Sequence, residues 1–327
     1  MEITVAVTTF NEGEYLDSLL SDLSRQNCSL LFEIVLVEAG DYDIERARKY
    51  LGQHSGKLVF HHHPRLSRTK SLNFIFDTAK GDLIVRLDAR SHVNSEYLMD
   101  IYRLSIESGA ENVGGVMKPI GSIDVQSFIA DIMKHPLSFG GARARQLNFS
   151  GFADSVYLGA FRKSKCNYGK EWFDSTHARI SEDSDLNYRI RKNGGHIFLD
   201  SSIIVEHYPR ENLNKFFRLC FNYGVSRGLF MLKHRFFTAY RQLVPPFSFL
   251  IAVLLLVFGF LNPTAFVLLL LLIALYLIVI LIVSLSISKS TKQFITSILG
   301  LIGCHFFWTT GLLFAPFIFA KDLHNAH

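Results

Sequence analysis

Two long stretches without a charged side chain dominate the C-terminal third of the chain. No Asp, Glu, Lys or Arg occurs from Gln242 to Ser288, and a second such stretch extends from Gln293 to Ala320. Because a bilayer core requires about 20 apolar residues per helix, the first stretch is long enough for two helices separated at Asn262-Pro263, and the second for one more. We therefore predict three transmembrane helices, at about 243–261, 264–287 and 294–320.

Basic residues flank these stretches. They crowd the approach to the first helix and reappear between the second and the third: Lys215, Arg218, Arg227, Lys233, Arg235, Arg241, Lys289 and Lys292. The positive-inside rule places both segments in the cytoplasm, and the Asn262-Pro263 turn and the tail 321–327 outside. The first residues lack a basic start followed by a long apolar core, so they do not look like a secretory signal. We expect a multi-pass protein of the cell (inner) membrane with residues 1–210 in the cytoplasm and an amphipathic interface segment at 211–241.

The composition limits the partners. The chain has 327 residues, 49% of them hydrophobic, and a net charge of +5. Its basic clusters lie beside apolar helices, which favours membrane lipid or phosphate as partners over nucleic acid. The four cysteines show no C-x-x-C spacing, which is typical of buried thiols in a reducing compartment rather than of zinc sites or disulfides.

Residues 1–210 alternate between short β-rich runs and helical patterns. The runs are ITVAVTT, EIVLVEA, KLVFHHH, DLIVRLD and NVGGVMK, and helical spacing occurs in EYLDSLLSDLSRQ and RTKSLNFIFDTAK. The alternation predicts an α/β fold with a Rossmann-like, mainly parallel sheet and helices on both faces. Ligands of such sheets bind at the carboxyl ends of the strands, where polar residues gather here, so we expect a binding cleft there. The histidines at 61–63 alternate between the faces of their strand and are left out of the site.

An ordered series of motifs resembles the family 2 glycosyltransferases, which have the GT-A fold. The series is VAVTTFNEGEYL, EIVLVEAGDYD, LNFIFDTAKGDLIVRLDARS and ISEDSDLNYRIRKNGG. NVGGVMKPIG, DSVYLGAFRK and RLCFNYGVSR are similar to the branch typified by the succinoglycan-biosynthesis glucosyltransferase. The resemblance implies a membrane-anchored inverting hexosyltransferase. Its donor would be a nucleotide sugar, with a UDP-sugar favoured, and its acceptor a lipid-linked saccharide in polysaccharide or glycoconjugate biosynthesis.

The resemblance assigns several residues to the donor nucleotide. Thr9 and Phe10 stand where the family contacts the base ring, and Glu12 where it hydrogen-bonds the ribose or the base. Glu38 stands where the family usually has an aspartate, and its carboxylate can accept the same hydrogen bonds. A structural alternative, compatible with the first, is that Asn11 caps the following helix and Glu12 favours its first turn.

Positive charge and a metal are the next requirements. Arg68 and Lys70 precede a predicted helix whose N-terminal amides attract anions, although a solvated basic loop is the alternative. In RLDARS, Asp88 opens the metal-binding D-x-D pattern of the family, but Arg90 occupies the third place and cannot ligate a metal. Three outcomes stay open: Asp88 and His92 hold Mg or Mn through the diphosphate, Arg90 replaces the ion, or the enzyme is impaired.

The acceptor side is assigned from two further motifs. ISEDSDLNYRIRKNGG reads as a helix with Ser181 at its N-cap, and the resemblance makes Asp183 the general base with Glu182 beside it. Simple complementarity to the helix dipole is the structural alternative. Gly159 and Arg162 are assigned to the acceptor side, where a strand followed by a basic turn is the alternative.

The late part of the sequence departs from the processive members of the family. Their Q-x-x-R-W motif is absent, and only Arg218, Tyr223 and Arg227 stand nearby, which favours a single addition per binding event. The same departure, together with Arg90, motivates a second hypothesis. In it, the chain is a non-catalytic scaffold of a membrane polysaccharide synthase complex.

Overall fold

The computed structural model describes residues 1–140, 143–146, 148–166, 171–175, 182–235 and 240–324, which form two compact units. The first unit contains Met1–Ile120 and Gly140–Tyr208, and the second contains Gly121–Phe139 and Pro209–His327. The boundary expected near residue 210 lies close to the end of the first unit. Residues 121–139, however, belong to the second unit and not to the N-terminal domain in which the sequence placed them.

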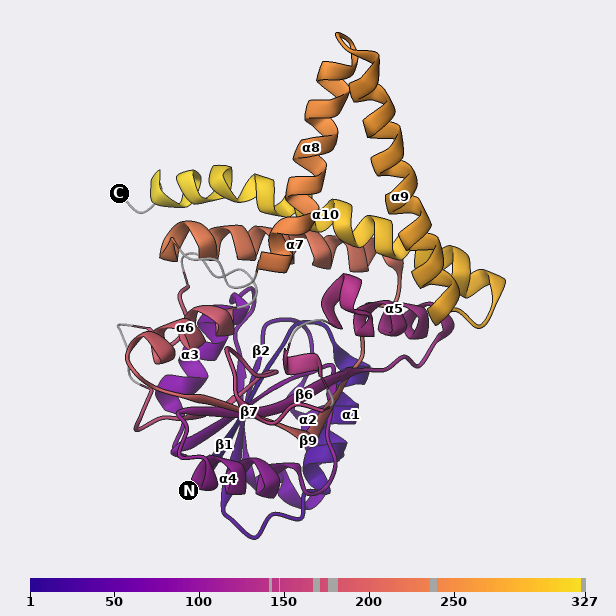
Figure 1. Cartoon of the computed structure of the whole chain (residues 1–327). Coiled ribbons are helices and arrows are strands. Elements are labelled where there is room, and N and C mark those ends of the chain that lie inside the picture. The colour runs from indigo at the N-terminus through magenta and orange to yellow at the C-terminus, as the bar shows by residue number, and fades with distance from the viewer. Residues whose placement is uncertain (141–142, 147, 167–170, 176–181, 236–239, 325–327) are drawn as a thin grey trace. The chain divides into compact units, whose positions relative to one another are not determined.

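A mixed sheet forms the centre of the first unit (Figure 1). The described residues give it nine strands: β1 (Ile3–Thr9), β2 (Phe32–Glu38), β3 (Leu58–His62), β4 (Leu83–Asp88), β5 (Ser91–His92), β6 (Asn112–Pro119), β7 (Gly151–Phe152), β8 (Ala160–Arg162) and β9 (Ile197–His207). Their order is β3-β2-β1-β4-β8-β6-β9-β5, with β7 beside β9. The first four strands in this order are parallel, and β8 runs antiparallel to both of its neighbours. The α/β fold with strands at the five predicted runs is confirmed.

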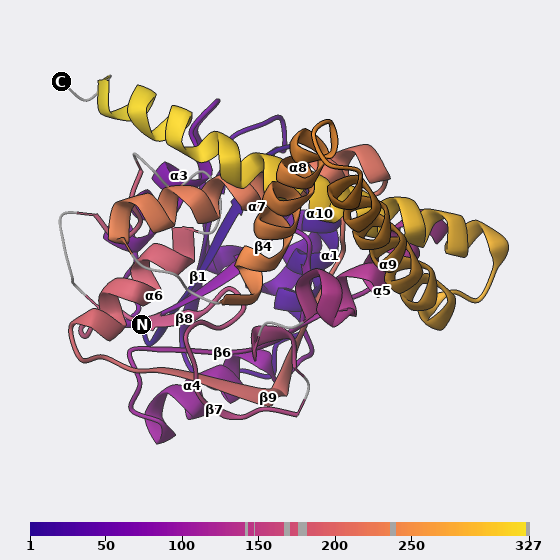
Figure 2. The same cartoon turned by 45° about the horizontal axis from the view of Figure 1, so that its top comes forward.

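Helices cover both faces of this sheet, as predicted (Figure 2). One face packs against α1 (Gly13–Ser24), α2 (Ile44–Leu51) and α4 (Tyr97–Glu107). The other face packs against α3 (Arg68–Thr78) and α6 (Glu182–Lys192). Because the central strands are buried on both sides, they read in the sequence as nearly continuous apolar runs.

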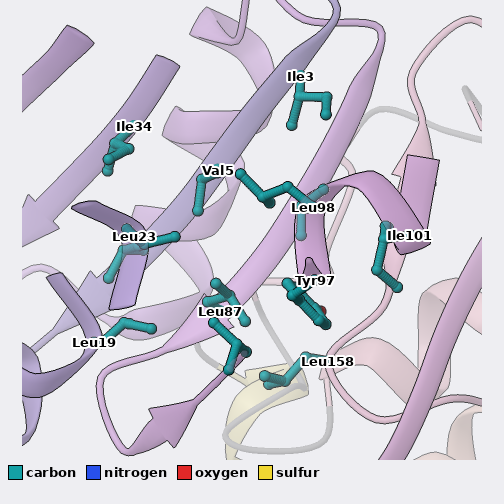
Figure 3. Packing of buried hydrophobic residues seen from close by; sticks show 14 of the residues in the cluster. Ile3, Val5, Leu19, Leu23, Ile34, Leu87, Tyr97, Leu98, Ile101 and Leu158 are labelled. Carbon is teal, nitrogen blue, oxygen red and sulfur yellow. The ribbon is translucent and has the colours of Figure 1, made fainter. Parts of the chain in front are cut away.

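The packing between the sheet and its first helix follows from two periodicities (Figure 3). In β1, Ile3 and Val5 point to the face that α1 covers, since alternate strand residues share a face. In α1, the fully buried leucines recur at helical spacing: Leu16, Leu19, Leu20 and Leu23. Each such side chain contributes roughly 1.5–3 kcal/mol on burial, so this face fixes the helix against the sheet.

The start of α1 differs from the capping expected of Asn11. The helix begins at Gly13 with Glu12 at its N-cap position, and Glu12 makes no side-chain capping hydrogen bond. Asn11 has a positive φ of 53°, and its side-chain oxygen accepts from the amide of Asp41 in the next loop. Asn11 therefore ties two strand-end loops together, and the structural alternative in which it caps the helix does not hold. Ser181, the cap expected for α6, lies outside the described residues.

The second unit is helical. Its helices are α5 (Asp124–Lys134), α7 (Leu213–His234), α8 (Val244–Gly259), α9 (Pro263–Ile287) and α10 (Thr291–His324). Among the described residues, α9 and the Thr291–Ala320 part of α10 are long and apolar enough to cross a bilayer. At 16 residues α8 is shorter, although it is equally free of charge. Helices thus occupy all three stretches expected to span the membrane.

Two side-chain contacts join residues 121–139 to α10 within the second unit. The ammonium group of Lys292 in α10 lies 3.0 Å from the carboxylate of Asp124 in α5. The side-chain amide of Gln293 donates to the carboxylate of Asp131, also at 3.0 Å. The start of α10 is therefore fixed to α5 by polar contacts that sequence separation conceals.

Candidate active site

Strand register brings the first polar residues of the site to one edge of the sheet. Thr9 at the end of β1 pairs with Glu38 at the end of β2, and Thr8 pairs with Asp88 at the end of β4. Three adjacent parallel strands thus present their carboxyl ends side by side. This is the edge at which α/β sheets bind ligands.

Two arginines join this edge to the start of α6. The guanidinium of Arg68, the first residue of α3, donates to both carboxylate oxygens of Asp88 at 2.8 and 2.6 Å. It also lies 3.3 Å from the carboxylate of Glu182. Arg86 in β4 lies 2.6 Å from Glu182 and 3.6 Å from Asp88. We call Arg68, Arg86, Asp88 and Glu182 the arginine–carboxylate cluster; it brings together strand β4 and the helix on which Asp183 lies.

The cluster divides the three carboxyl groups by their ionisation. Burial raises the pKa of Asp88 and of Glu182, but the nearby charges of Arg68 and Arg86 outweigh it, so that both pKa values are lowered. Burial also raises the pKa of Asp183; the charge of Glu182 adds to this rise, and the arginines offset only part of it. A carboxyl group with a raised pKa next to two that stay ionised is the pattern expected of an acid–base residue.

Sequence reasoning assigned no role to Arg86. It is buried in the middle of β4, and its Nε and Nη1 atoms have no hydrogen-bond partner within the described residues. A signal was available, because an arginine inside an apolar strand two residues before Asp88 must point to the same face as Asp88. Buried charges require partners, so this position already indicated a second carboxylate nearby.

Glu38 is fully buried at the end of β2. Its carboxylate accepts from the amide of Gly40, and burial raises its pKa despite this hydrogen bond. Phe10, two residues beyond the Thr8 pairing, is 61% exposed and can present its ring to a ligand. Thr9, which precedes Phe10 in the chain, is buried.

Arg90 pairs with Glu12 and not with a carboxylate of the arginine–carboxylate cluster. Its guanidinium lies 2.7 Å from the Glu12 carboxylate and 4.2 Å from the centre of the Tyr15 ring, in a cation–π contact. Both contacts join the loop after β4 to the start of α1. Arg90 therefore holds a predicted nucleotide-binding carboxylate in place, and the structure gives the position beside Asp88 to Arg68 and Arg86.

The residues around Asp88 do not fit a metal held by the protein. His92 lies in β5, and its Nδ1 is 2.6 Å from the carboxylate of Asp22, not paired with Asp88. The Asp88 carboxylate is itself engaged by two guanidinium groups. Across the described ranges, no three His, Cys, Asp or Glu side chains converge as metal ligands. A divalent cation would have to displace Arg68 from the only carboxylate of the D-x-D position.

Three further predicted positions fall in different places. Lys70 lies in the first turn of α3 with an exposed side chain. Gly159 accepts from the amide of Arg86 through its carbonyl and so lies beside the cluster. Arg162 is paired in register with Leu83 at the opposite end of β4 from Asp88, and it contacts Asp82 at 3.1 Å. Arg162 thus lies away from Asp88, because β8 runs antiparallel to β4, and its assignment to the acceptor side stays a prediction.

The exclusion of the three histidines agrees with their orientation. The rings of His61 and His63 lie on one face of the chain and pack edge-on against Phe74. His62 points the other way, and its Nε2 lies 2.8 Å from the carbonyl oxygen of Gly40. They do not converge on a common ligand.

The α/β fold, with Asp88, Arg68 and Arg86 at the carboxyl ends of its parallel strands and Glu182 beside them, agrees with the predicted GT-A fold of the glycosyltransferases. The model of the family "Glycosyl transferase family 2" matches residues 4–168, half of the chain. The chain belongs to this family.

Two characterised proteins are similar over most of their length. The succinoglycan biosynthesis protein ExoA of Rhizobium meliloti is 24% identical over 245 residues, which cover 74% of this chain and 73% of that protein. The dolichyl N-acetyl-alpha-D-glucosaminyl phosphate 3-beta-D-2,3-diacetamido-2,3-dideoxy-beta-D-glucuronosyltransferase of Methanococcus voltae is 22% identical over 265 residues. That match covers 77% of this chain and 80% of the transferase.

Solved structures of S. aureus TarS are also similar. The structure of TarS 1-349 in complex with UDP gives a TM-score of 0.47 at 19% identity and covers 69% of this chain and 65% of that one. A structure of TarS 1-349 gives 0.49 at 14% identity and covers 97% and 91% of the two chains.

Proposed function

We propose that this family 2 glycosyltransferase is an inverting hexosyltransferase. It takes a sugar from a nucleotide sugar, with a UDP-sugar favoured, and adds it to a lipid-linked saccharide in polysaccharide or glycoconjugate biosynthesis. The observation that carries the proposal is the arginine–carboxylate cluster, which puts fixed positive charge next to Asp183 at the carboxyl edge of the sheet. Names of two relatives, one in succinoglycan biosynthesis and one acting on a dolichyl phosphate sugar, support the substrate class.

The donor occupies the edge formed by β1, β2 and β4. Phe10 provides an exposed ring for the base, and Glu38 and Glu12 provide carboxylates for imide or ribose hydroxyl hydrogen bonds. Arg90 positions Glu12 through its ion pair. Direct displacement at the sugar carbon needs no covalent intermediate, so no second carboxylate of hydrolase type is required.

The departing diphosphate is stabilised by guanidinium groups. Arg68 is partly exposed and forms bidentate contacts readily, and Arg86 has two buried donor atoms without a partner among the described residues. These charges take the place that the D-x-D metal has elsewhere in the family, because Asp88 is already paired with them. Mg or Mn is then an accessory to the donor at most.

Asp183 accepts the proton of the acceptor hydroxyl as that oxygen attacks. Its pKa, raised by burial and by the charge of Glu182, makes it a stronger base than an ordinary carboxylate, and the arginines hold Glu182 ionised. Lys70 supplies additional positive charge at the exposed start of α3. The two neighbouring carboxylates of α6 thus have different roles.

The test is turnover by the purified full chain. Incubation with a panel of UDP-sugars and a membrane extract containing lipid-linked acceptors, with and without Mn, should release nucleotide and give a product one sugar heavier by mass analysis. Asp183→Asn should lower the rate by about 10²–10⁴-fold with little change in donor affinity. The matched variant Asp154→Asn, which removes an exposed carboxylate paired with Arg191, should retain full activity. No turnover with any donor, or equal rates for the two variants, would favour the non-catalytic scaffold.

A further inference from the structure

Helix α10 packs along α7, which carries too much charge to cross a membrane. The two helices run in the same direction: Gly303 contacts Phe217, Gly224 contacts Trp308, and Gly228 contacts Ala315. Added Cβ atoms at Gly224 and at Gly311 would overlap backbone carbonyl oxygens of the other helix, so the backbones touch. Helix α7 contains four Lys and Arg residues within its 22 residues: Lys215, Arg218, Arg227 and Lys233. Because the two helices are packed against each other, α10 could cross a membrane only if the charged helix α7 crossed it too.

Polar contacts hold both the start and the middle of α10 outside a hydrocarbon environment. Lys292 and Gln293 bind carboxylates of the polar helix α5. At the midpoint of the apolar stretch, Nε2 of His305 lies 2.6 Å from the carbonyl oxygen of Leu137, in an irregular turn that follows α5. Lipid-exposed irregular backbone does not occur within a bilayer core. The middle of α10 therefore lies at the level of a turn that must stay at or above the membrane surface.

The two faces of α10 are arranged for an interface. Apart from Leu301, the buried residues of α10 are small or polar: Gln293, Ser297, Gly300, Gly303, Cys304, Thr309, Gly311 and Ala315. Large apolar side chains are exposed along the opposite side: Ile295, Leu299, Phe306, Leu313, Phe314 and Phe317. A helix with one protein-bound face and one exposed apolar face is suited to lie in the plane of a membrane surface.

The α8–α9 hairpin is the part that is apolar on all sides. No residue of α8 is buried, and α8 and α9 meet at a turn without charge and diverge from it (Figure 1). Figure 2 shows the same hairpin from another side. At this turn Phe260 and Leu261 are 85% and 82% exposed. Helix α8 is about 24 Å long, which falls short of a hydrocarbon core of about 30 Å, whereas α9 is about 37 Å long. Tyr276, near the middle of α9, has its hydroxyl 3.1 Å from Nδ1 of His305 in α10.

We propose that a lipid bilayer is the partner of this surface, and that the chain binds it from one side. The α8–α9 hairpin enters the bilayer and returns to the same side, while α7 and α10 lie along the surface. The C terminus then stays on the side of the N-terminal unit, in contrast to the three-span topology. Every Lys and Arg from residue 209 onward, including Lys321, lies outside the hairpin, as the positive-inside rule requires for a hairpin with both ends in the cytoplasm.

The topology is tested by reporters attached after His327 of the full chain in bacterial cells. A fluorescent protein that matures only in the cytoplasm should be bright, and alkaline phosphatase, active only outside, should be inactive. Both topologies place Ser288 inside, so the same reporters inserted after Ser288 within the full chain are the matched control. Phosphatase activity at His327 equal to that of an exported reference, with a dark fluorescent fusion, would overturn the proposal.

A second measurement uses a short epitope tag, in case the reporter fusions fail to fold. An epitope tag after His327 should be removed by protease from inverted membrane vesicles and protected in intact spheroplasts; the reverse pattern contradicts the hairpin. The untagged chain should also stay in the membrane pellet after an alkaline carbonate wash. Recovery as a soluble dimer would instead identify a second copy of the chain as the cover of the hairpin. None of these readouts depends on sugar transfer, so failure here is distinguishable from failure of the proposed function.

Discussion

At the scale of single residues, Glu182 connects the arginines to the proposed base. Its side chain is buried and contacts both Arg68 and Arg86, and its charge raises the pKa of Asp183. Two neighbouring acids on one helix turn therefore share an electrostatic environment and respond to it in opposite ways. Because the two acids are coupled, a substitution of Glu182 should change how the rate depends on pH.

Glu182→Gln should move the acid limb of the rate profile to lower pH. As the proposed base, Asp183 must be ionised, so activity should be lost as pH falls through its pKa, which burial and the charge of Glu182 raise above the ordinary value of 3.8. The substitution removes that negative charge and frees the arginines to act on Asp183, so both effects lower its pKa. The measurement is kcat/KM against pH for both proteins. Glu45→Gln, at an exposed ion pair on α2, should leave the limb in place; an upward shift in Glu182→Gln would contradict the assignment.

Arg86→Met should destabilise the first unit by about 3–5 kcal/mol, because it leaves buried Glu182 with one fewer partner. The folded-state pKa values of Asp88 and Glu182 are lowered, so the stability that Arg86 provides is present at neutral pH and is lost as pH falls through them. The difference in free energy of unfolding between the two proteins should accordingly shrink below pH about 4.

Denaturant titration in detergent at pH 7 and pH 3.5 measures this difference. Arg191→Met, which breaks the ion pair with the exposed Asp154, is the matched control and should cost less than about 1 kcal/mol at either pH. A destabilisation by Arg86→Met that does not change with pH would mean that packing against Phe173, and not charge, accounts for its role.

At the scale of elements, the α7–α10 pair depends on glycines that let two backbones touch. Gly224→Val should destabilise the second unit by about 1–3 kcal/mol, because the new side chain collides with the carbonyl of Trp308 and cannot be accommodated without separating the helices. Asn222→Val introduces the same side chain at an exposed position of the same helix and is the control. Thermal unfolding of both variants is the measurement, and equal midpoints would show that the helices are not closely packed.

At the scale of the whole molecule, the proposed membrane attachment should matter mainly for the proposed lipid-linked acceptor. A chain held at a lipid surface meets lipid-linked acceptors at a high effective concentration, whereas a nucleotide sugar arrives from solution in either case. Replacing a long polyprenyl carrier by a short water-soluble analogue should therefore raise the acceptor KM by at least about tenfold. The donor KM should not change. Steady-state kinetics with the two acceptors in liposomes test this. An equal acceptor KM for both would show that membrane attachment does not raise the effective concentration of the acceptor at the site.

Local sequence patterns predicted much of the fold. The five β-rich runs and the two helical patterns lie where they were expected, since alternation and 3.6-residue spacing are properties of a single segment. The positions of Glu38 and Asp88 followed for the same reason, because strand ends in a parallel sheet share one edge. The position of Arg162 could not be predicted in this way, since no local pattern shows that β8 runs antiparallel to β4.

The amino-acid sequence by itself determined the segments, their chemical character and the edge of the sheet at which polar residues gather. Only the tertiary structure decided which charges meet: Arg90 with Glu12, Arg68 with Asp88, and Arg86 with Glu182. It also decided that residues 121–139 pack with the C-terminal helices and that α10 follows α7. The physical reason is the same in each case. An ion pair or a helix contact depends on the distance between two segments that are far apart in the sequence, whereas a hydropathy pattern describes a single segment.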